Sequence, residues 1–314
     1  MIKHFLAFEK QIADLEGKIE ELRHLSSGSD INIADEIGKL QASVSEKLKS
    51  TYSQLSPWQK VLVSRHPERP HFQDIINSLF QDYISLSGDR NFAEDNALTG
   101  GIARFRGKSV IAIGIDKGKN TQDRIHKNFG MARPEGYRKA QRLMQLANDF
   151  SIPVLMFVDT AGAYPGKGAE QRGQAEAIAK CLQKSLEITV PSISVITGEG
   201  GSGGAVALAV ANTTLMLEHA IYSVISPEGC SSILWRSSDH ADQAAEALKL
   251  TAQDMEKFKI IDEIIPEPIG GAHRDPIITI KSIGDVIEKK LNELMVLSKD
   301  ELIKLKEKKY LEIG

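Results

Sequence analysis

Five glycines crowd a short stretch in the second half of the chain, at residues 198–204 (GEGGSGG). A β-branched run at residues 192–197 precedes them and an Ala/Val-rich segment follows, so the pattern predicts a strand, a turn and a helix. Glycine lets a backbone approach a ligand closely, and the first N–H groups of a helix lack intrahelical partners. The stretch is therefore a candidate site for an anion, or for an oxyanion that forms during a reaction.

Three chemical templates fit this stretch. Its first, second and fourth glycines satisfy G-x-G-x-x-G, the fingerprint of dinucleotide-binding folds. Ser202, flanked by glycines two residues away on each side, satisfies G-x-S-x-G, the turn that presents the nucleophile of α/β-hydrolases. The adjacent Gly200 and Gly201 would serve as an oxyanion hole built from backbone N–H groups. Spacing alone leaves all three open.

The surrounding sequence favours the backbone interpretation. Glu218 stands where a dinucleotide fold would place its ribose-binding acid, but only about three helical turns fit before Asn212. The hydrolase interpretation has the required chain order of Ser202, Asp262 and His273. That order is weak support, because Asp and His are easily found over such a distance and Ser202 also suits a helix N-cap. Of the three templates, an oxyanion hole made of backbone N–H groups requires the fewest specific side chains.

A second glycine-rich loop, at residues 159–168 (DTAGAYPGKG), follows another predicted strand at residues 152–158. Its glycines suggest that a ligand lies against backbone there. Upstream, residues 117–142 hold eight Lys and Arg residues against two acidic residues, although the whole chain carries a net charge of −3. This focusing indicates an anionic ligand, with a solvated basic face as an equal alternative. Nucleic acid is not expected as a partner, since no aromatic residues interleave usefully with the charges and no nucleic-acid-binding motif appears.

The order of predicted elements defines an α/β domain over residues 98–270, with ligand sites at the strand ends. Amphipathic spacing predicts a helical hairpin over residues 1–50, which either packs on its own domain or binds a partner. Further helices are predicted at residues 72–83 and 170–186 and from Pro134 onward. Beyond Asp275 the chain is helical and charged, and its Lys- and Glu-rich end is expected to be solvated or frayed.

The composition excludes several classes of protein. An apolar content of 41% and a charged content of 26% are those of an ordinary globular protein. The two cysteines, Cys181 and Cys230, lack C-x-x-C spacing, which argues against a disulfide framework or structural zinc and favours a reducing compartment. Glu9 and Lys10 interrupt the start before any apolar leader develops, and no run approaches the ~18 apolar residues of a membrane-spanning helix. We therefore expect a cytoplasmic protein with no membrane partner.

Long runs of the chain resemble one family almost end to end. They lie at residues 9–12 (EKQI), 65–70 (RHPERP), 88–90 (GDR), 127–140 (KNFGMARPEGYRKA), 159–168, 198–204 and 226–230 (SPEGC). On these runs the chain resembles the α subunit of the carboxyltransferase component of bacterial acetyl-CoA carboxylase, in the crotonase-like superfamily. The resemblance implies an α/β fold with a crotonase-like spiral of ββα units, an N-terminal helical hairpin and C-terminal helices.

We expect three parts on this basis. They are a helical N-terminal region for interaction or packing at residues 1–97, a crotonase-like carboxyltransferase domain at residues 98–275, and a C-terminal helical tail at residues 276–314.

The resemblance also implies that the chain forms one half of a carboxyltransferase site. The family moves a carboxyl group from carboxybiotin, carried on a separate biotin carboxyl carrier protein, to acetyl-CoA. The product is malonyl-CoA, in the first committed step of fatty acid synthesis. A zinc-ribbon β subunit completes the site in an α2β2 assembly, and no metal is expected on this chain. The sequence agrees with this division of parts, since it holds neither a Met-Lys-Met biotinylation site nor a four-cysteine zinc ribbon.

The same resemblance implies roles for particular residues. Gly200 and Gly201 match the backbone pair that faces the ureido oxygen of biotin, whereas the β subunit holds the acetyl-CoA enolate. The residues that match the lining of the carboxybiotin slot are Gly162, Ala163 and Tyr164. The residues expected to meet a carboxylate or a CoA phosphate are Arg133, Arg138 and Lys139.

Two positions depart from the family pattern. Ala161 and Lys167 stand where Pro and an apolar residue are common, so the detailed shape of the loop at residues 159–168 is expected to differ. The alternative function, outside this family, is a serine hydrolase that uses Ser202.

Overall fold

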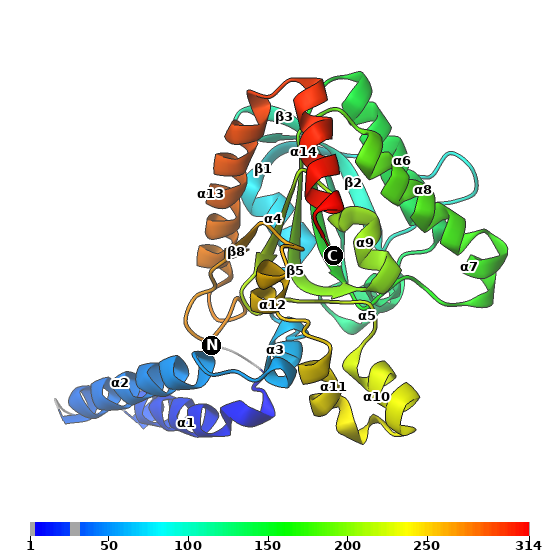
Figure 1. Ribbon diagram of the computed structural model, residues 1–314. Coiled ribbons are helices and arrows are strands. Elements are labelled where there is room, and N and C mark those ends of the chain that lie inside the picture. The colour runs from blue at the N-terminus through cyan, green and yellow to red at the C-terminus, as the bar shows by residue number, and fades with distance from the viewer. Residues whose placement is uncertain (1–3, 26–31, 314) are drawn as a thin grey trace.

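The computed structural model describes residues 4–25 and 32–313. Across these two ranges the chain forms an eight-stranded mixed sheet wrapped by helices (Figure 1). The strands are β1 (Phe80–Ser85), β2 (Leu98–Phe105), β3 (Lys108–Ile115), β4 (Val154–Thr160), β5 (Ser192–Gly201), β6 (Thr213–Leu217), β7 (Ile221–Ser223) and β8 (Glu263–Ile265). Their order is β1-β2-β3-β4-β5-β6-β8, with β7 paired to the end of β5.

The direction of the strands positions the site. Strands β1, β2 and β3 pair antiparallel, and the register from β3 through β4, β5 and β6 to β8 is parallel. Strand β4 is buried along its whole length, which accounts for its continuous apolar run at residues 154–158, and β5 is buried along all but its last residue. The carboxyl ends of β3, β4 and β5 therefore meet at one edge of the sheet, which is where open α/β sheets hold ligands.

The helices follow the predicted alternation with the strands. They are α1 (Lys10–Leu25), α2 (Asn32–Tyr52), α3 (Pro57–Ser64), α4 (Phe72–Leu79), α5 (Thr121–His126), α6 (Pro134–Asp149), α7 (Lys167–Gln171), α8 (Gln174–Glu187), α9 (Ser202–Ala209), α10 (Pro227–Trp235), α11 (Ala241–Ala247), α12 (Ala252–Lys257), α13 (Pro276–Met295) and α14 (Lys299–Leu311). Helices α6 and α8 pack side by side, and α8 also packs on α9. Within the described residues, no helix combines the length and apolar content needed to cross a membrane.

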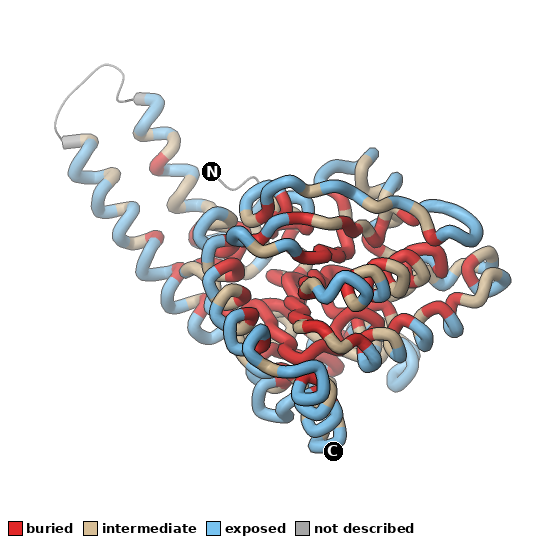
Figure 2. The backbone as a smooth tube through the Cα atoms, turned by 90° about the horizontal axis from the view of Figure 1, so that it is seen from above, coloured by how far each residue is buried: buried red, intermediate tan, exposed pale blue. Residues whose placement is uncertain are grey.

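The predicted N-terminal hairpin is confirmed as α1 and α2. Figure 2 shows the two helices projecting from the body, with their buried residues on the facing sides. A small apolar cluster of its own holds the hairpin together, made by Ile12, Ile19, Val44, Leu48 and Tyr52 with Val63 from α3. The main core is separate and combines the sheet with residues of α4, α6, α8, α9 and α13.

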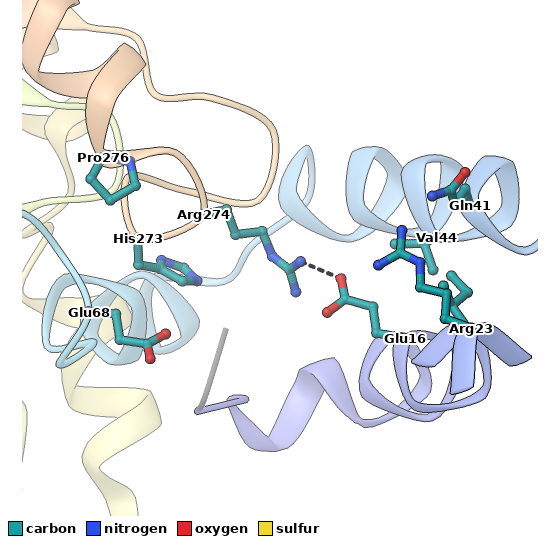
Figure 3. A pocket seen from close by; sticks show the side chains of 9 residues that line it. Glu16, Arg23, Gln41, Val44, Glu68, His273, Arg274 and Pro276 are labelled. Carbon is teal, nitrogen blue, oxygen red and sulfur yellow. Dashed lines mark hydrogen bonds and ion pairs between the residues drawn. The ribbon is translucent and has the colours of Figure 1, made fainter. Parts of the chain in front are cut away.

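Polar contacts fasten the hairpin to the body (Figure 3). Arg274 donates to Glu16 at 2.6 Å and to the buried Glu9 at 3.3 Å, and the Tyr52 hydroxyl donates to Glu9 at 2.9 Å. The rings of His66 and His273 stack with centroids 3.8 Å apart beside these contacts. A cavity of about 580 Å³ lies between the hairpin and the body, lined in part by Arg274 and Glu16.

Three expectations about local structure are wrong. The helix predicted at residues 72–83 ends at Leu79, and the chain continues as the edge strand β1, which pairs with β2. The helix predicted at residues 170–186 is two helices, because Gly173 adopts φ 78° between them. The charged C-terminal end packs as α14, where Leu302 and Lys306 are buried and the Lys306 amine donates to two carbonyls at the end of α8.

Candidate active site

The glycine pair stands where β5 ends and α9 begins. The sequence predicted a turn at Gly200 and Gly201, but β5 continues through both of them. Gly200 pairs with Thr160 of β4 on one side and with Tyr222 of β7 on the other. The chain turns one residue later, at Ser202, whose φ of 48° lies in the left-handed region. Glycine is needed in the strand because a Cβ on Gly200 would lie 2.9 Å from the Tyr222 ring.

The two glycine-rich segments predicted to bind a ligand lie in backbone contact. A Cβ on Gly201 would lie 2.2 Å from the carbonyl oxygen of Ala161, and a Cβ on Gly204 would lie 2.8 Å from the backbone nitrogen of Ala163. Neither position could carry a side chain without moving the backbone of the loop after β4. The structure therefore brings the predicted oxyanion pair beside the predicted slot lining, although the sequence separates them by nearly forty residues.

Hydrogen bonds fix the shape of the loop after β4, some within the loop and some to the segment before α6. The Thr160 hydroxyl accepts from the Gly162 N–H at 3.0 Å and lies 2.7 Å from the carbonyl oxygen of Gly130. The N–H of Tyr164 donates to the carbonyl of Ala132 at 3.0 Å. Gly162, Ala163 and Tyr164 are half-buried, so the loop presents backbone and small side chains to a molecule arriving from solvent.

The three predicted anion-binding residues do not share one environment. Arg133 is exposed, and its guanidinium carbon lies 5.0 Å from the centroid of the Tyr164 ring. Arg138 donates to the buried Asp89 at 3.2 Å. Lys139 is 1% exposed and pairs with Glu94. Of these three, Arg133 alone presents its charge to solvent beside the loop, while Arg138 and Lys139 anchor α6 to the segment between β1 and β2.

A chain of charged side chains next to the glycine pair was missed by the sequence interpretation. The Lys117 amine lies 2.7 Å from an Asp159 oxygen and 2.6 Å from a Glu199 oxygen. Arg65 donates to the other oxygen of Glu199 at 2.6 Å and also pairs with Glu228. A carboxylate within two residues of the end of each of two predicted strands was the available signal, because parallel strands bring such residues together at one edge.

These partners shift the pKa values of the chain of charges. Burial alone would lower the pKa of Lys117, but Asp159 and Glu199 raise it above its usual value. Burial alone would raise the pKa of Glu199, but Lys117 and Arg65 lower it. Lys117 and Glu199 are therefore both ionised near neutral pH, and the glycine pair is flanked by fixed charges.

An apolar cavity opens on the other side of the glycine pair. Its volume is about 540 Å³, and its lining includes Ser202 and Gly203 from the start of α9, Tyr222 and Val224 from β7 and the residue after it, and Phe258. Val224 is 78% exposed and Phe258 48% exposed.

The hydrolase alternative is not supported by the geometry. Asp262 pairs with Lys309 and accepts from the N–H of Thr214, at the first residues of β6. Ser202 follows the far end of the parallel neighbour β5, on the order of 25 Å away at ~3.3 Å per residue. His273 stacks on His66 beside the hairpin. The three residues belong to three separate environments, so no triad forms.

The described residues also contain no group of three or more His, Cys, Asp and Glu side chains that could hold a metal ion.

Fold and site together define the class. The chain has a crotonase-like carboxyltransferase fold, as found in the transcarboxylase 12S structure with methylmalonyl-CoA bound (TM-score 0.58, 20% identity, 71% of this chain and 42% of that chain). The Pseudomonas malonate decarboxylase hetero-tetramer in complex with coenzyme A is similar as well (TM-score 0.55, 14% identity, 67% of this chain and 84% of that chain). The chain spans less than half the length of the transcarboxylase chain.

The chain belongs to the acetyl co-enzyme A carboxylase carboxyltransferase-like family, whose model matches residues 5–314. Among its relatives, the acetyl-coenzyme A carboxylase carboxyl transferase subunit alpha of Paramagnetospirillum magneticum is 59% identical over 99% of this chain and 98% of the relative. The protein of the same name from Rhodospirillum centenum is 58% identical over the same shares of the two chains. The chain is therefore a transferase, and carboxyl transfer to acetyl-CoA in fatty acid synthesis is its function.

Proposed function

We propose that the β5–α9 junction and the loop after β4 form the carboxybiotin half of a carboxyltransferase site. The supporting observation is the backbone contact between the two glycine-rich segments, in which a Cβ on Gly201 would lie 2.2 Å from the Ala161 carbonyl oxygen. This contact sets donor groups at Gly200 and Gly201 beside the half-buried residues Gly162, Ala163 and Tyr164. A group carried by another protein can reach such a site from solvent.

The role of this chain in the reaction is to stabilise negative charge. Negative charge develops on the ureido oxygen of biotin as the carboxyl group leaves. Backbone N–H groups at Gly200 and Gly201 are the proposed donors to that oxygen, and the first N–H groups of α9 add to them because no intrahelical acceptor takes them. A donor of this kind contributes about 3 kcal/mol to a transition state where it has been removed in other enzymes.

The side chains around the donors suit a carried bicyclic group. Gly162 and Ala163 leave room against the backbone, and Tyr164 offers a flat face. Arg133, over that ring, is the proposed contact for a carboxylate or a CoA phosphate. Arg138 and Lys139 then act indirectly, by fixing α6 through Asp89 and Glu94.

The partners follow from the missing half of the site. We infer a β subunit with a zinc ribbon that holds the acetyl-CoA enolate, an α2β2 assembly, and a separate biotin carboxyl carrier protein, all acting in the cytoplasm. Support comes from the name of the relatives, which are α subunits, and from the hetero-tetrameric state of the similar malonate decarboxylase. The exposed apolar side chains Val224 and Phe258 next to the junction are consistent with a covering partner.

We keep the three-part division of the chain as a proposal. Residues 98–275 carry the site, the N-terminal region 1–97 serves packing or interaction, and the tail 276–314 supports the sheet. Strand β1 of the N-terminal region pairs with β2, and Leu302 of the tail is buried, so both flanking parts pack on the body.

A pair of matched glycine variants tests the proposed site. Gly201→Ala should abolish malonyl-CoA-dependent carboxylation of biotin by the chain reconstituted with its β subunit, because the new Cβ displaces the Ala161 carbonyl and separates the two segments. Gly203→Ala is the control, since its Cβ would meet only Ile178 side-chain atoms, at 3.5 Å or more, and the N–H remains.

The decisive comparison is made on complexes of equal assembly, measured by size-exclusion chromatography. Equal turnover of the two variants would refute the assignment of the donors. Activity of this chain without a β subunit would refute the half-site.

A further inference from the structure

Five charged side chains link the ends of three strands and two helices at the proposed site. Lys117 follows β3, Asp159 stands next to last in β4, and Glu199 lies just before the glycine pair in β5. Arg65 ends α3 and Glu228 lies in the first turn of α10. Two cations and three carboxylates alternate along this chain of contacts.

The inner part of the network is almost free of water. The side chains of Lys117 and Asp159 are each 11% exposed, and that of Glu199 is 9% exposed. The N–H of Glu199 donates to Asp159 at 2.9 Å, so the two strands are joined directly as well as through the lysine. A Cβ on Gly198 would lie 2.4 Å from an Asp159 oxygen, which shows how tightly the carboxylate fits between the strands.

We propose that Lys117 is a positioning residue for carboxyl transfer, which holds the ends of β4 and β5 at the separation that the two glycine segments require. The proposal rests on the proposed location of the carboxybiotin site. Lys117 pairs with a carboxylate of each segment, and neither carboxylate is among the residues proposed to meet substrate. It acts through Asp159, two residues before Ala161, and through Glu199, the residue before Gly200.

The physical reason is repulsion between carboxylates. Without Lys117, Asp159 and Glu199 would face each other, with Arg65 bound to Glu199 on its outer side. The other charged groups nearby are already engaged, since Lys127 binds Asp116 at 3.1 Å and Arg65 also pairs with Glu228. The strand ends must then separate, or one carboxyl group must take up a proton. A displacement of about 1 Å at a site of this kind can lower a rate by roughly 100-fold.

The test uses Lys117→Met in the reconstituted complex with the β subunit and carrier protein. At pH 8 the variant should show a kcat roughly 100-fold below that of the unaltered complex, with an unchanged KM for malonyl-CoA. As the pH falls to 6, protonation of one carboxyl group should relieve the repulsion, and the deficit should shrink. A purely structural packing role of the lysine stem would leave the deficit independent of pH.

Two further variants make the outcome specific. Lys119→Met is the matched control, because Lys119 is about half exposed and pairs with Asp74 at the surface, and its kcat should not change. Lys117→Met/Glu199→Gln removes one charge of each sign, so its activity relative to the unaltered complex should no longer depend on pH. Unchanged kcat of Lys117→Met, or a deficit with the same size at pH 6 and pH 8, would overturn the proposal.

Failure of this inference can be told apart from failure of the proposed site. If Gly201→Ala is inactive and Lys117→Met is fully active, the proposed site is supported and the positioning role of Lys117 is refuted. If Gly201→Ala is fully active, the site itself is misplaced.

Discussion

At the scale of single residues, reactive-looking side chains and functional ones are different sets. Ser202 has the spacing of a nucleophile, yet it is exposed, carries the turn into α9 and has no Asp or His partner. The residues that flank the proposed site with charge are Lys117, Asp159 and Glu199, and none of the three chemical templates assigns a role to their side chains. A site that stabilises charge through backbone donors needs few side chains with acid–base function.

Two substitutions of Ser202 test different predictions, one about activity and one about stability. Ser202→Ala should keep most carboxyl transfer, because no hydroxyl chemistry is required. Ser202→Gly should raise the free energy of unfolding by up to about 1 kcal/mol, since glycine adopts the φ of 48° without the cost that an L side chain bears there. Turnover assays and urea unfolding measure the two effects. Loss of all activity in a folded, assembled Ser202→Ala complex would restore the nucleophile hypothesis.

At the scale of elements, the ends of helices and strands meet through buried polar groups. Lys306 in α14 is 1% exposed, and its amine donates to the carbonyls of Ser185 and Ile188 at 2.9 and 2.6 Å. These carbonyls lie at the C-terminal end of α8, where the helix provides no further N–H group to donate to them. Burial lowers the pKa of Lys306 to about 8, so the contact between α14 and α8 carries a charge that costs stability.

The sign of the resulting pH dependence is fixed. The pKa of Lys306 is about 8 in the folded chain and near the ordinary 10.5 in the unfolded chain, so between these values the unfolded chain binds more protons. The cost of the buried charge is therefore fully present below pH 8 and is relieved as the pH rises. Relative to Lys306→Met, the free energy of unfolding of the unaltered chain should rise by about 2 kcal/mol between pH 8 and pH 10. Urea unfolding at both pH values checks this, and a constant difference would contradict it.

At the scale of the whole molecule, the hairpin of α1 and α2 has its own apolar cluster and depends on few contacts for its place on the body. Glu9 is fully buried and receives Arg274 and the Tyr52 hydroxyl. A buried carboxylate with its cation removed is strongly destabilising, by about 3–5 kcal/mol. Arg274 is thus the main electrostatic link between the C-terminal part of the body and the hairpin.

Arg274→Met should loosen the hairpin while the sheet stays folded. Hydrogen exchange of α1 and α2 should accelerate, and that of β4 and β5 should not, because the hairpin cluster and the main core are separate. Arg104→Met is a suitable control, since its ion pair with Asp82 is exposed and contributes about 0–1 kcal/mol. Equal exchange in both variants would show that the hairpin is held by packing alone.

The family, the α/β alternation, the hairpin and the two glycine-rich segments could all be predicted from the sequence, because each depends on local patterns. Apolar periodicity and backbone freedom act over a few residues. The continuation of β5 through Gly201 and the pairing of Arg138 and Lys139 could be seen only in the folded chain. The same holds for the contacts of Glu199 with Lys117, 82 residues away, and with Arg65, 134 residues away. Such contacts depend on strand order and on which charges burial forces together, and no local pattern records either.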